Sequence, residues 1–420
     1  MGEENAEVAA PSGTSTGDIS EAFSSNAVRL SVAEWVVAVG LLVATALLLP
    51  WLVQRREAFQ PSADYRHPYL LSEDYWLYAR YSRYVASQHR VAVIGDSVVW
   101  GHYVDPQGTL THFLNREAGK PLFANLGLDG TRPMALAGLV RYYCPSIARQ
   151  GVILHLNPLW MSSDDADLHQ RESPAEGRPL SAARVRELLR GRPESDQEGL
   201  RINHPRLVPQ LFSRPYGYHP SLGEAIGVGL ERHLPYAAWL WHVRMVYFEN
   251  LGLPAWTMGN PYRNPLSAVT LRLPQPDDRP EGDPVPWFRS GVERQEFPWV
   301  PLDHSYQWAR FRETLEVLRA RHNTVFVVLG PMNTHLMTDG SSRRYAQTKA
   351  GMEAWLKAQG VPYYAPSSLP SGLYADASHP LKAGYAMLAR QLFRDTGFQE
   401  WVRGVGERRA YRRPRARGDG

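Results

Sequence analysis

The chain has 420 residues, 44% of them hydrophobic and 11% aromatic, which is enough to build one large or two medium globular domains. This composition excludes a chain that is disordered throughout, and the single cysteine, Cys144, excludes a disulfide framework and a thiolate metal site. The net charge of +4 is uneven, because residues 403–420 carry seven arginines against two acids, a local +5 that leaves −1 for the rest.

The N-terminal region divides into two parts. Residues 1–30 are rich in Ser, Ala, Gly, Thr and acids without periodicity, which predicts a disordered leader. Residues 31–54 predict a transmembrane helix, since no charge occurs from Trp35 to Val53 and nineteen helical residues span about 30 Å. Trp35 and Trp51 stand near its two ends, as in an aromatic belt.

Two observations give opposite predictions for the orientation of the transmembrane helix. Arg55 and Arg56 directly follow it, and the positive-inside rule then favours a cytoplasmic location for the large C-terminal part. The family resemblance described below implies the opposite side, and we expect an extracytoplasmic domain on a single-pass anchor.

Short apolar runs alternate with helical patterns beyond the anchor. Residues 55–90 form a juxtamembrane segment with an aromatic, amphipathic helix over 73–88. The predicted strands are 91–94, 122–126, 152–156, 324–329 and 361–364, and the predicted helices are 134–149, 306–321, 342–359 and 381–394. This alternation predicts an α/β domain, formed by 91–160 and 306–396, with a parallel sheet covered by helices on both faces.

The alternation is interrupted by residues 161–305, which predict an insertion that forms a mainly helical cap over the site. Its apolar stripe is open to four interpretations, namely an acyl pocket, a membrane-docking face, a partner site or the core of the cap itself. The residues of the stripe are Trp239, Trp241, Val243, Val246 and Tyr247. The acidic run of Asp164, Asp165 and Asp167 lacks the spacing of a metal site, and solvated charge is expected there.

The C-terminal segment, residues 397–420, is basic and rich in Gly, Pro and Arg. It is expected to be unfolded and either to favour anionic surfaces or to be a solvated end without a partner. Nucleic-acid binding is not expected, because no folded motif accompanies the charge.

Ser97 is the first candidate for chemistry. In VAVIGDS a buried strand runs into a Gly95–Asp96 turn, so the Ser97 hydroxyl stands at the carboxyl end of the first strand, where sites of parallel sheets lie. A serine is a nucleophile only beside a base and oxyanion donors, and a helix cap is the commoner use of this tripeptide.

A base for Ser97 is offered by the sequence DASHP near the end of the chain. Asp376 can accept the Nδ1 proton of His379 and leave Nε2 free to deprotonate Ser97. Pro380 suits the first position of the following helix, whose positive terminus is expected to keep the imidazole neutral. The alternative for this motif is a surface turn with a helix cap.

Two further positions predict oxyanion donors. Gly130 closes a turn after the second strand, where a glycine lets a substrate oxygen approach a backbone N–H. Asn157 ends the third strand, and Pro158 holds it extended so that its amide projects from the strand end. Structural roles in the turn and at the strand end are the alternatives.

The order of these blocks resembles the SGNH (GDSL) hydrolase superfamily. Gly95 to Ser97, Gly130, Asn157 and Asp376 with His379 match its pattern over about residues 90–395. The resemblance implies a three-layer, flavodoxin-like α/β/α domain without metal or cofactor. It also implies that Ser97 is the nucleophile, His379 the general base and acid, and Asp376 its orienting group. The implied oxyanion hole consists of the N–H groups of Ser97 and Gly130 and the Asn157 amide.

One branch of that superfamily is more similar than the rest. The N-terminal anchor, the Asn157–Pro158 pair and the run Val327 to Met337 look like the membrane-anchored branch that includes D-alanine transfer and alginate O-acetylation proteins. This implies an esterase or O-acyltransferase acting on acylated carbohydrate of the envelope or of an exported polysaccharide, beside a multi-pass membrane acyltransferase. A non-catalytic scaffold with the same fold and a soluble lipase with a cleaved leader are the rival hypotheses.

Three other polar residues lie near the strand ends. Asn333 and His335 follow the fourth strand and either line the cleft or stabilise a turn. His155 stands where the superfamily usually has a glycine, and its alternation with leucines predicts a buried histidine whose polar atoms are satisfied.

Overall fold

A computed structural model of the chain describes residues 31–56, 59–168, 204–207, 222–269, 274 and 284–412. The predicted leader, residues 1–30, lies outside these ranges. Residues 1–52 and 53–420 form two compact units. The helix α1 (Val32–Arg56) has 25 residues, of which those up to Leu52 belong to the first unit, and its apolar side chains are mostly exposed. Among the described residues, α1 alone is long and apolar enough to cross a membrane.

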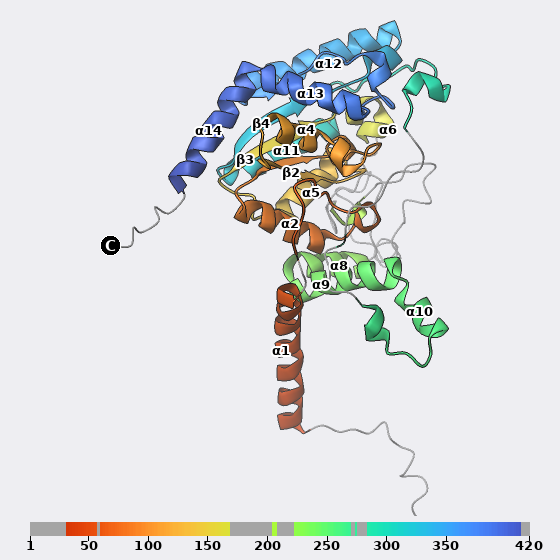
Figure 1. The fold of residues 1–420 in the computed structure, drawn as a ribbon, viewed down its shortest axis with the longest axis vertical. Coiled ribbons are helices and arrows are strands. Elements are labelled where there is room, and N and C mark those ends of the chain that lie inside the picture. Colours follow the sequence, from red (N-terminus) through yellow and green to blue (C-terminus); the bar gives the residue numbers. More distant parts are fainter. Residues whose placement is uncertain are drawn as a thin grey trace, which may run out of the picture. The chain divides into compact units, whose positions relative to one another are not determined.

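The second unit is built on a five-stranded sheet in which every strand pairing is parallel, as predicted. The strand order is β2-β1-β3-β4-β5 (Figure 1). The strands are β1 (Val91–Gly95), β2 (Phe123–Gly127), β3 (Gly151–Leu156), β4 (Thr324–Leu329) and β5 (Tyr363–Tyr364). The residues of β1, β2 and β3 are all buried, which explains why these strands appear in the sequence as continuous apolar runs.

Helices cover both faces of the sheet (Figure 1). One face carries α4 (Leu110–Glu117), α13 (Lys382–Arg394) and α14 (Thr396–Arg412). The other carries α2 (Tyr75–Ser87), α5 (Pro133–Tyr143), α11 (Tyr306–Ala320) and α12 (Asp339–Ala358). The α/β class predicted from the sequence is therefore confirmed. The helix predicted over 134–149 ends earlier, at Tyr143, because a proline at 145 disfavours helical backbone in the preceding residue.

The C-terminal segment differs from the expectation, since its residues 397–412 are helical within α14 rather than unfolded. Phe398, Trp401 and Val405 recur at spacings of three and four and are buried in the core that also contains Phe326 of β4. Burial of three large side chains outweighs the poor helix propensity of the glycines that suggested disorder. Residues 413–420 of the predicted tail lie outside the described residues.

The described part of the insertion is mainly helical, as predicted. Its principal elements are α6 (Asp164–Asp167), α8 (Leu222–His233), α9 (Pro235–Val243), the π-helix η7 (Arg244–Asn250) and α10 (Leu253–Gly259). Residues 169–203, 208–221, 270–273 and 275–283, which also fall in the predicted insertion, lie outside the described ranges.

Among the described insertion helices, α9 packs against α2, and the expected cap over the strand ends stays a prediction. Trp241 Nε1 donates a hydrogen bond of 3.0 Å to the carbonyl oxygen of Glu73. His242 Nδ1 lies 2.5 Å from Oδ2 of Asp74, and both side chains are buried. These partners at the N-terminus of α2 satisfy polar groups of α9 and explain its position.

Asp167, which was expected to be a solvated charge, is fully buried. Its carboxylate accepts hydrogen bonds from the Ser305 hydroxyl and, at 2.8 Å, from the Tyr306 N–H, where α11 begins. The aspartate therefore fastens the start of the insertion to its end. Within the described ranges, no group of three or more His, Cys, Asp and Glu side chains is placed to hold a metal ion.

Candidate active site

Ser97 lies where β1 meets α3 (Ser97–Trp100). Asp96 caps this helix by accepting a backbone N–H at 3.1 Å, and Ser97 is its first residue. A side chain is excluded at Gly95, because a Cβ there would lie 2.6 Å from Cγ2 of Val99. The glycine lets strand and helix approach closely and sets the Ser97 hydroxyl at the carboxyl edge of the sheet.

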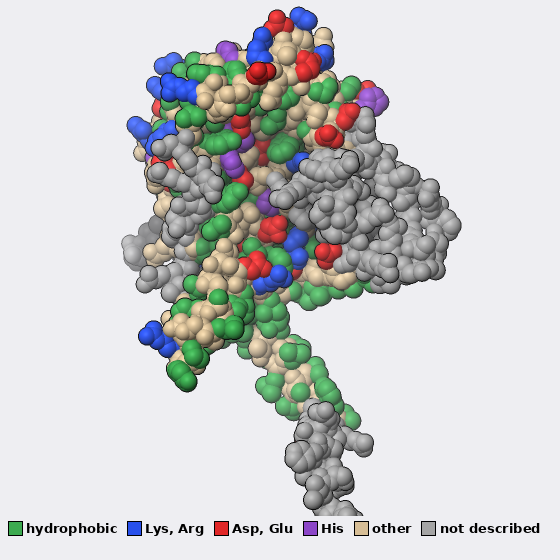
Figure 2. All heavy atoms as spheres, turned by 90° about the vertical axis from the view of Figure 1, so that its right-hand side faces the viewer, with side chains coloured by type: hydrophobic (Ala, Val, Ile, Leu, Met, Phe, Trp, Pro, Cys, Tyr) green, Lys and Arg blue, Asp and Glu red, His purple; other side chains and the backbone are tan. Residues whose placement is uncertain are grey.

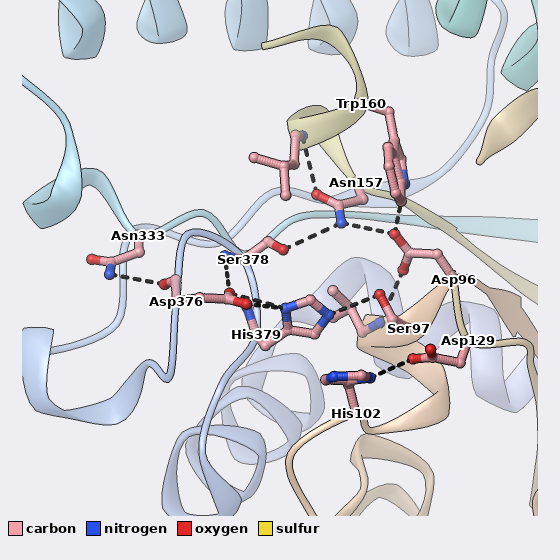
Figure 3. Close-up of polar contacts among 12 residues, drawn as sticks. Asp96, Ser97, His102, Asp129, Asn157, Trp160, Asn333, Asp376, Ser378 and His379 are labelled. Carbon is pink, nitrogen blue, oxygen red and sulfur yellow. Dashed lines mark hydrogen bonds and ion pairs between the residues drawn. The ribbon is translucent and has the colours of Figure 1, made fainter. Parts of the chain in front are cut away.

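His379 reaches Ser97 from the loop before α13, at the other end of the chain. Its Nε2 lies 2.8 Å from Ser97 Oγ, and its Nδ1 lies 2.7 Å from Oδ2 and 2.9 Å from Oδ1 of Asp376 (Figure 3). Oδ1 of Asp376 also accepts the backbone N–H groups of Ser378 and His379, each at 2.9 Å. The structure therefore brings the three predicted catalytic side chains together in the order carboxylate, imidazole, hydroxyl.

The carboxylates around His379 control its protonation. Burial by itself lowers the pKa of an imidazole, but the carboxylates of Asp376, Asp96 and Asp129, with Asp376 first, together outweigh it, and the pKa of His379 lies above its ordinary value. Burial raises the pKa of Asp376, and contact with His379 outweighs that effect and brings it to about 2. The expectation that the positive end of the following helix keeps the His379 imidazole neutral was wrong. The helix α13 begins only at Lys382, and the Asp376 carboxylate is nearer to the ring.

Asp96 forms a buried centre beside the nucleophile that the sequence did not predict. Its Oδ2 accepts hydrogen bonds from Asn157 Nδ2 at 2.7 Å and Trp160 Nε1 at 2.8 Å (Figure 3). Its Oδ1 lies 3.2 Å from His155 Nδ1. Burial raises the pKa of Asp96, but contact with His155 and the hydrogen bond from Asn157 outweigh it, and the net pKa is lowered. Asp96 therefore stays ionised and ties the end of β3 to the start of α3.

His155 is buried, as predicted, and its other ring nitrogen, Nε2, lies 2.9 Å from the carbonyl oxygen of Gly330 after β4. The ring thus connects the ends of β1, β3 and β4. The alternation of His155 with leucines predicted that the residue is buried, but it did not predict that the ring faces the Asp96 carboxylate.

The predicted oxyanion donors lie at the same sheet edge, with Ser97 at the start of α3 and Gly130 and Asn157 on loops. One amide hydrogen of Asn157 is committed to Asp96, and the second faces Ser378 Oγ at 3.4 Å, a long contact that a stronger acceptor can replace. Gly130 lies in the turn after β2 with φ +69°. In the described ranges, no hydrogen bond engages the backbone N–H of Ser97 or Gly130, so both donors are available.

Comparison with known proteins leaves the site unassigned. No protein-family model and no curated protein sequence matches the chain. The chemistry of this site is therefore inferred from its own residues and their geometry.

Asn333 and His335 stabilise a loop rather than line the site. Asn333 is fully buried, and its Nδ2 donates a hydrogen bond of 3.0 Å to the backbone carbonyl of Asp376 (Figure 3). His335 Nε2 lies 3.0 Å from the carbonyl oxygen of Leu369. Of the two interpretations left open for these residues, the structure favours the turn role, and Asn333 positions the loop that carries Asp376.

His102 and Asp129 form a second histidine–carboxylate pair next to the first. His102 Nδ1 lies 2.7 Å from Oδ1 of Asp129, and the ring centroids of His102 and His379 are 5.6 Å apart (Figure 3). The neighbouring Tyr103 presents its ring edge-on to His379 at 5.4 Å. Burial and the Asp376 carboxylate raise the pKa of Tyr103 to about 12, so it remains a neutral phenol at the site. Sequence reasoning missed all three residues.

Proposed function

We propose that the chain is an SGNH-type serine ester hydrolase or O-acyltransferase that works through an acyl-Ser97 intermediate. The observation that carries the proposal is the continuous chain of contacts from Asp376 through His379 to the Ser97 hydroxyl. A serine hydroxyl attacks an ester when a base removes its proton, and His379 Nε2 lies at hydrogen-bonding distance for that transfer.

In the first half-reaction, Ser97 Oγ adds to the ester carbonyl carbon while its proton passes to His379 Nε2. Asp376 stabilises the imidazolium that forms. The N–H groups of Ser97 and Gly130 and the second amide hydrogen of Asn157 are the donors proposed for the oxyanion. The intermediate then expels the alcohol, which takes the proton from His379, and leaves the acyl group on Ser97.

In the second half-reaction, an acceptor hydroxyl attacks the acyl-serine while its proton passes to His379 Nε2. The bond between the acyl carbon and Ser97 Oγ then breaks, and Ser97 Oγ takes the proton back from His379. Water as acceptor gives an esterase, and a sugar hydroxyl gives an O-acyltransferase; the same triad serves both. From the SGNH resemblance we propose O-acyl groups, such as acetyl, on an envelope or exported polysaccharide as substrate, and a multi-pass membrane acyltransferase as partner.

The test of the triad uses the full-length chain and a fluorophosphonate probe, which forms a covalent adduct only with an activated serine. Wild type should be labelled, Ser97→Ala should not, and Ser87→Ala should be labelled like wild type, because Ser87 is an exposed residue at the end of α2. Mass spectrometry of the acyl-Ser97 adduct formed with candidate esters then identifies the donor. A folded wild type that stays unlabelled contradicts the proposal and favours the non-catalytic scaffold.

We also propose that α1 anchors the chain in a membrane with the folded domain outside the cytoplasm. The length and apolar exposed surface of α1 support the anchor. Resistance of the chain to extraction by carbonate, and digestion of the domain by protease added to intact cells, are the expected results. Protection of the domain would show that Arg55 and Arg56 set the opposite orientation.

A further inference from the structure

Helices α8–α10 and the turns that follow them leave large apolar side chains exposed. On α8, Ile226 and Leu230 lie four residues apart and are 51% and 45% exposed, while Ala225 and Val228 form its buried side. No residue of α10 is buried, and Met258 is 85% exposed. The exposed residues that define this apolar face are Ile226, Leu230, Leu234, Phe248, Met258 and Tyr262. Hydrophobic side chains gather at this end of the folded unit (Figure 2).

The apolar face is also poor in charge. From Leu222 to Val269 the chain carries six charged residues, which are Glu224, Glu231, Arg232, Arg244, Glu249 and Arg263. Two of these neutralise each other, since Arg244 Nε donates to Glu249 Oε1 at 2.7 Å. A protein interface usually has a polar rim, and a soluble surface usually has charges of both signs. A surface with few charges, on which Phe248 and Tyr262 are exposed beside aliphatic side chains, suits the boundary between lipid headgroups and acyl chains.

For the apolar stripe described in the sequence analysis, burial favours one of the four interpretations, the core of the insertion itself. Trp239 and Tyr247 are each only 8% exposed, so they belong to the core of this helical hairpin. The side chains that face outward are their neighbours, Leu240 and Phe248, at 45% and 51% exposure.

A short series of contacts connects the apolar face to the point where the chain leaves the proposed anchor. Arg80 on α2 donates to the carbonyl oxygen of Gln54 at 2.9 Å, and its guanidinium lies 5.6 Å from the ring centroid of Trp76. The ring of Trp76 lies against that of His242 of α9, tilted by 35° and with centroids 4.3 Å apart. All four residues belong to the second unit, residues 53–420. The end of the span and the apolar helices are therefore fastened to the same few residues of α2.

We propose that the apolar face of α8–α10 docks into the interfacial region of the lipid bilayer that α1 enters. The proposal rests on the membrane anchor proposed above and not on the catalytic chemistry. Because the contacts through α2 join this face to Gln54, just after residues 1–52, docking requires no long tether. An integral membrane partner covering the same face is the competing occupant.

The test measures how deeply single fluorophores lie in protein-free liposomes that contain the full-length chain. Cysteines at Met258→Cys and Tyr262→Cys carry an environment-sensitive dye, and the native Cys144 can stay because it is fully buried. Lipids with a spin label near the headgroup act as quenchers. Leu47→Cys in α1 reports the anchor, and Gln359→Cys, an exposed residue at the end of α12, is the negative control.

We expect about twofold or stronger quenching at Met258→Cys and Tyr262→Cys, little change at Gln359→Cys, and no effect of added salt, because the contact is apolar. The additional changes Ile226→Glu and Leu230→Glu should reduce the quenching at Met258→Cys. Quenching at Leu47→Cys without quenching at Met258→Cys and Tyr262→Cys overturns docking and leaves the anchor intact, as expected for a protein partner. Loss of quenching at Leu47→Cys overturns the anchor and docking together.

Discussion

Two histidine–carboxylate pairs lie side by side at the sheet edge and differ in what their second nitrogen meets. His379 and His102 each place Nδ1 2.7 Å from an aspartate oxygen. The side chain of His379 is 11% exposed and its Nε2 lies on Ser97 Oγ, whereas that of His102 is 27% exposed. Within the described residues, Nε2 of His102 has no hydrogen-bonding partner. A carboxylate partner alone therefore does not identify the base; contact with the hydroxyl does.

The largest expected effect comes from His379→Gln. Without the imidazole no group removes the proton of Ser97, and the rate of ester cleavage should fall by about 10⁴- to 10⁶-fold, as for the histidine of another serine hydrolase. The measurement is the rate of cleavage of a short acyl ester, with thermal unfolding showing that the variant folds. A variant that kept a tenth of the wild-type rate would mean that another base acts on Ser97.

Asp376→Asn should cost about 10⁴-fold in rate, because the amide no longer holds the required tautomer of His379. It should also change the pH dependence. The base works as the neutral imidazole, so the wild-type rate should fall as the pH drops through a pKa above the ordinary value of 6.5. Removal of the carboxylate leaves burial as the main influence on the pKa of His379, and the fall in rate should then occur at lower pH. If the rate falls at the same pH in Asp376→Asn as in wild type, Asp376 does not set the pKa of His379.

Local spacing predicted the Asp376–His379 pair and the position of Ser97, and the SGNH resemblance predicted the contact of His379 with Ser97, 282 residues away. Asp376 and His379 are three residues apart, and Ser97 directly follows a strand, so local spacing was informative. Asp96 and Asn157 are 61 residues apart, and His102 and Asp129 are 27 apart. Their contacts arise because parallel strands bring several loops to one edge, and no local pattern encodes which loop side chains then meet.

The same distinction applies to the fold. The apolar runs of β1 to β5 predicted each strand to within two residues at either end, because burial on both faces leaves a strong signature. The helix over 397–412 was missed because arginines and glycines surround the three side chains that it buries. The position of α9 depends on His242 meeting Asp74, 168 residues away, which composition does not reveal.

His102→Gln should have a smaller effect and makes the comparison sharper. If His102 contacts substrate without taking the Ser97 proton, its loss should change the rate by no more than about tenfold, below the 10²- to 10⁴-fold typical of a general base. We expect the change mainly in KM, measured on the same ester. A loss as large as that of His379→Gln would place both histidines in proton transfer and remove the distinction between the pairs.

Asp129→Asn should have the smallest effect on the rate of ester cleavage. It tests how far the Asp129 charge alone influences His379 of the other histidine–carboxylate pair. The Asp129 carboxylate contributes to the raised pKa of His379 from a distance, whereas Asp376 touches the ring. Its neutralisation should therefore move the acid limb of the rate profile to lower pH by less than Asp376→Asn does, with the plateau rate within about tenfold of wild type, because the His379 tautomer is untouched. A shift as large as that of Asp376→Asn would mean that the two carboxylates act on His379 as one group. If the rate falls at the same pH as in wild type, Asp129 interacts with His102 and does not affect the pKa of His379.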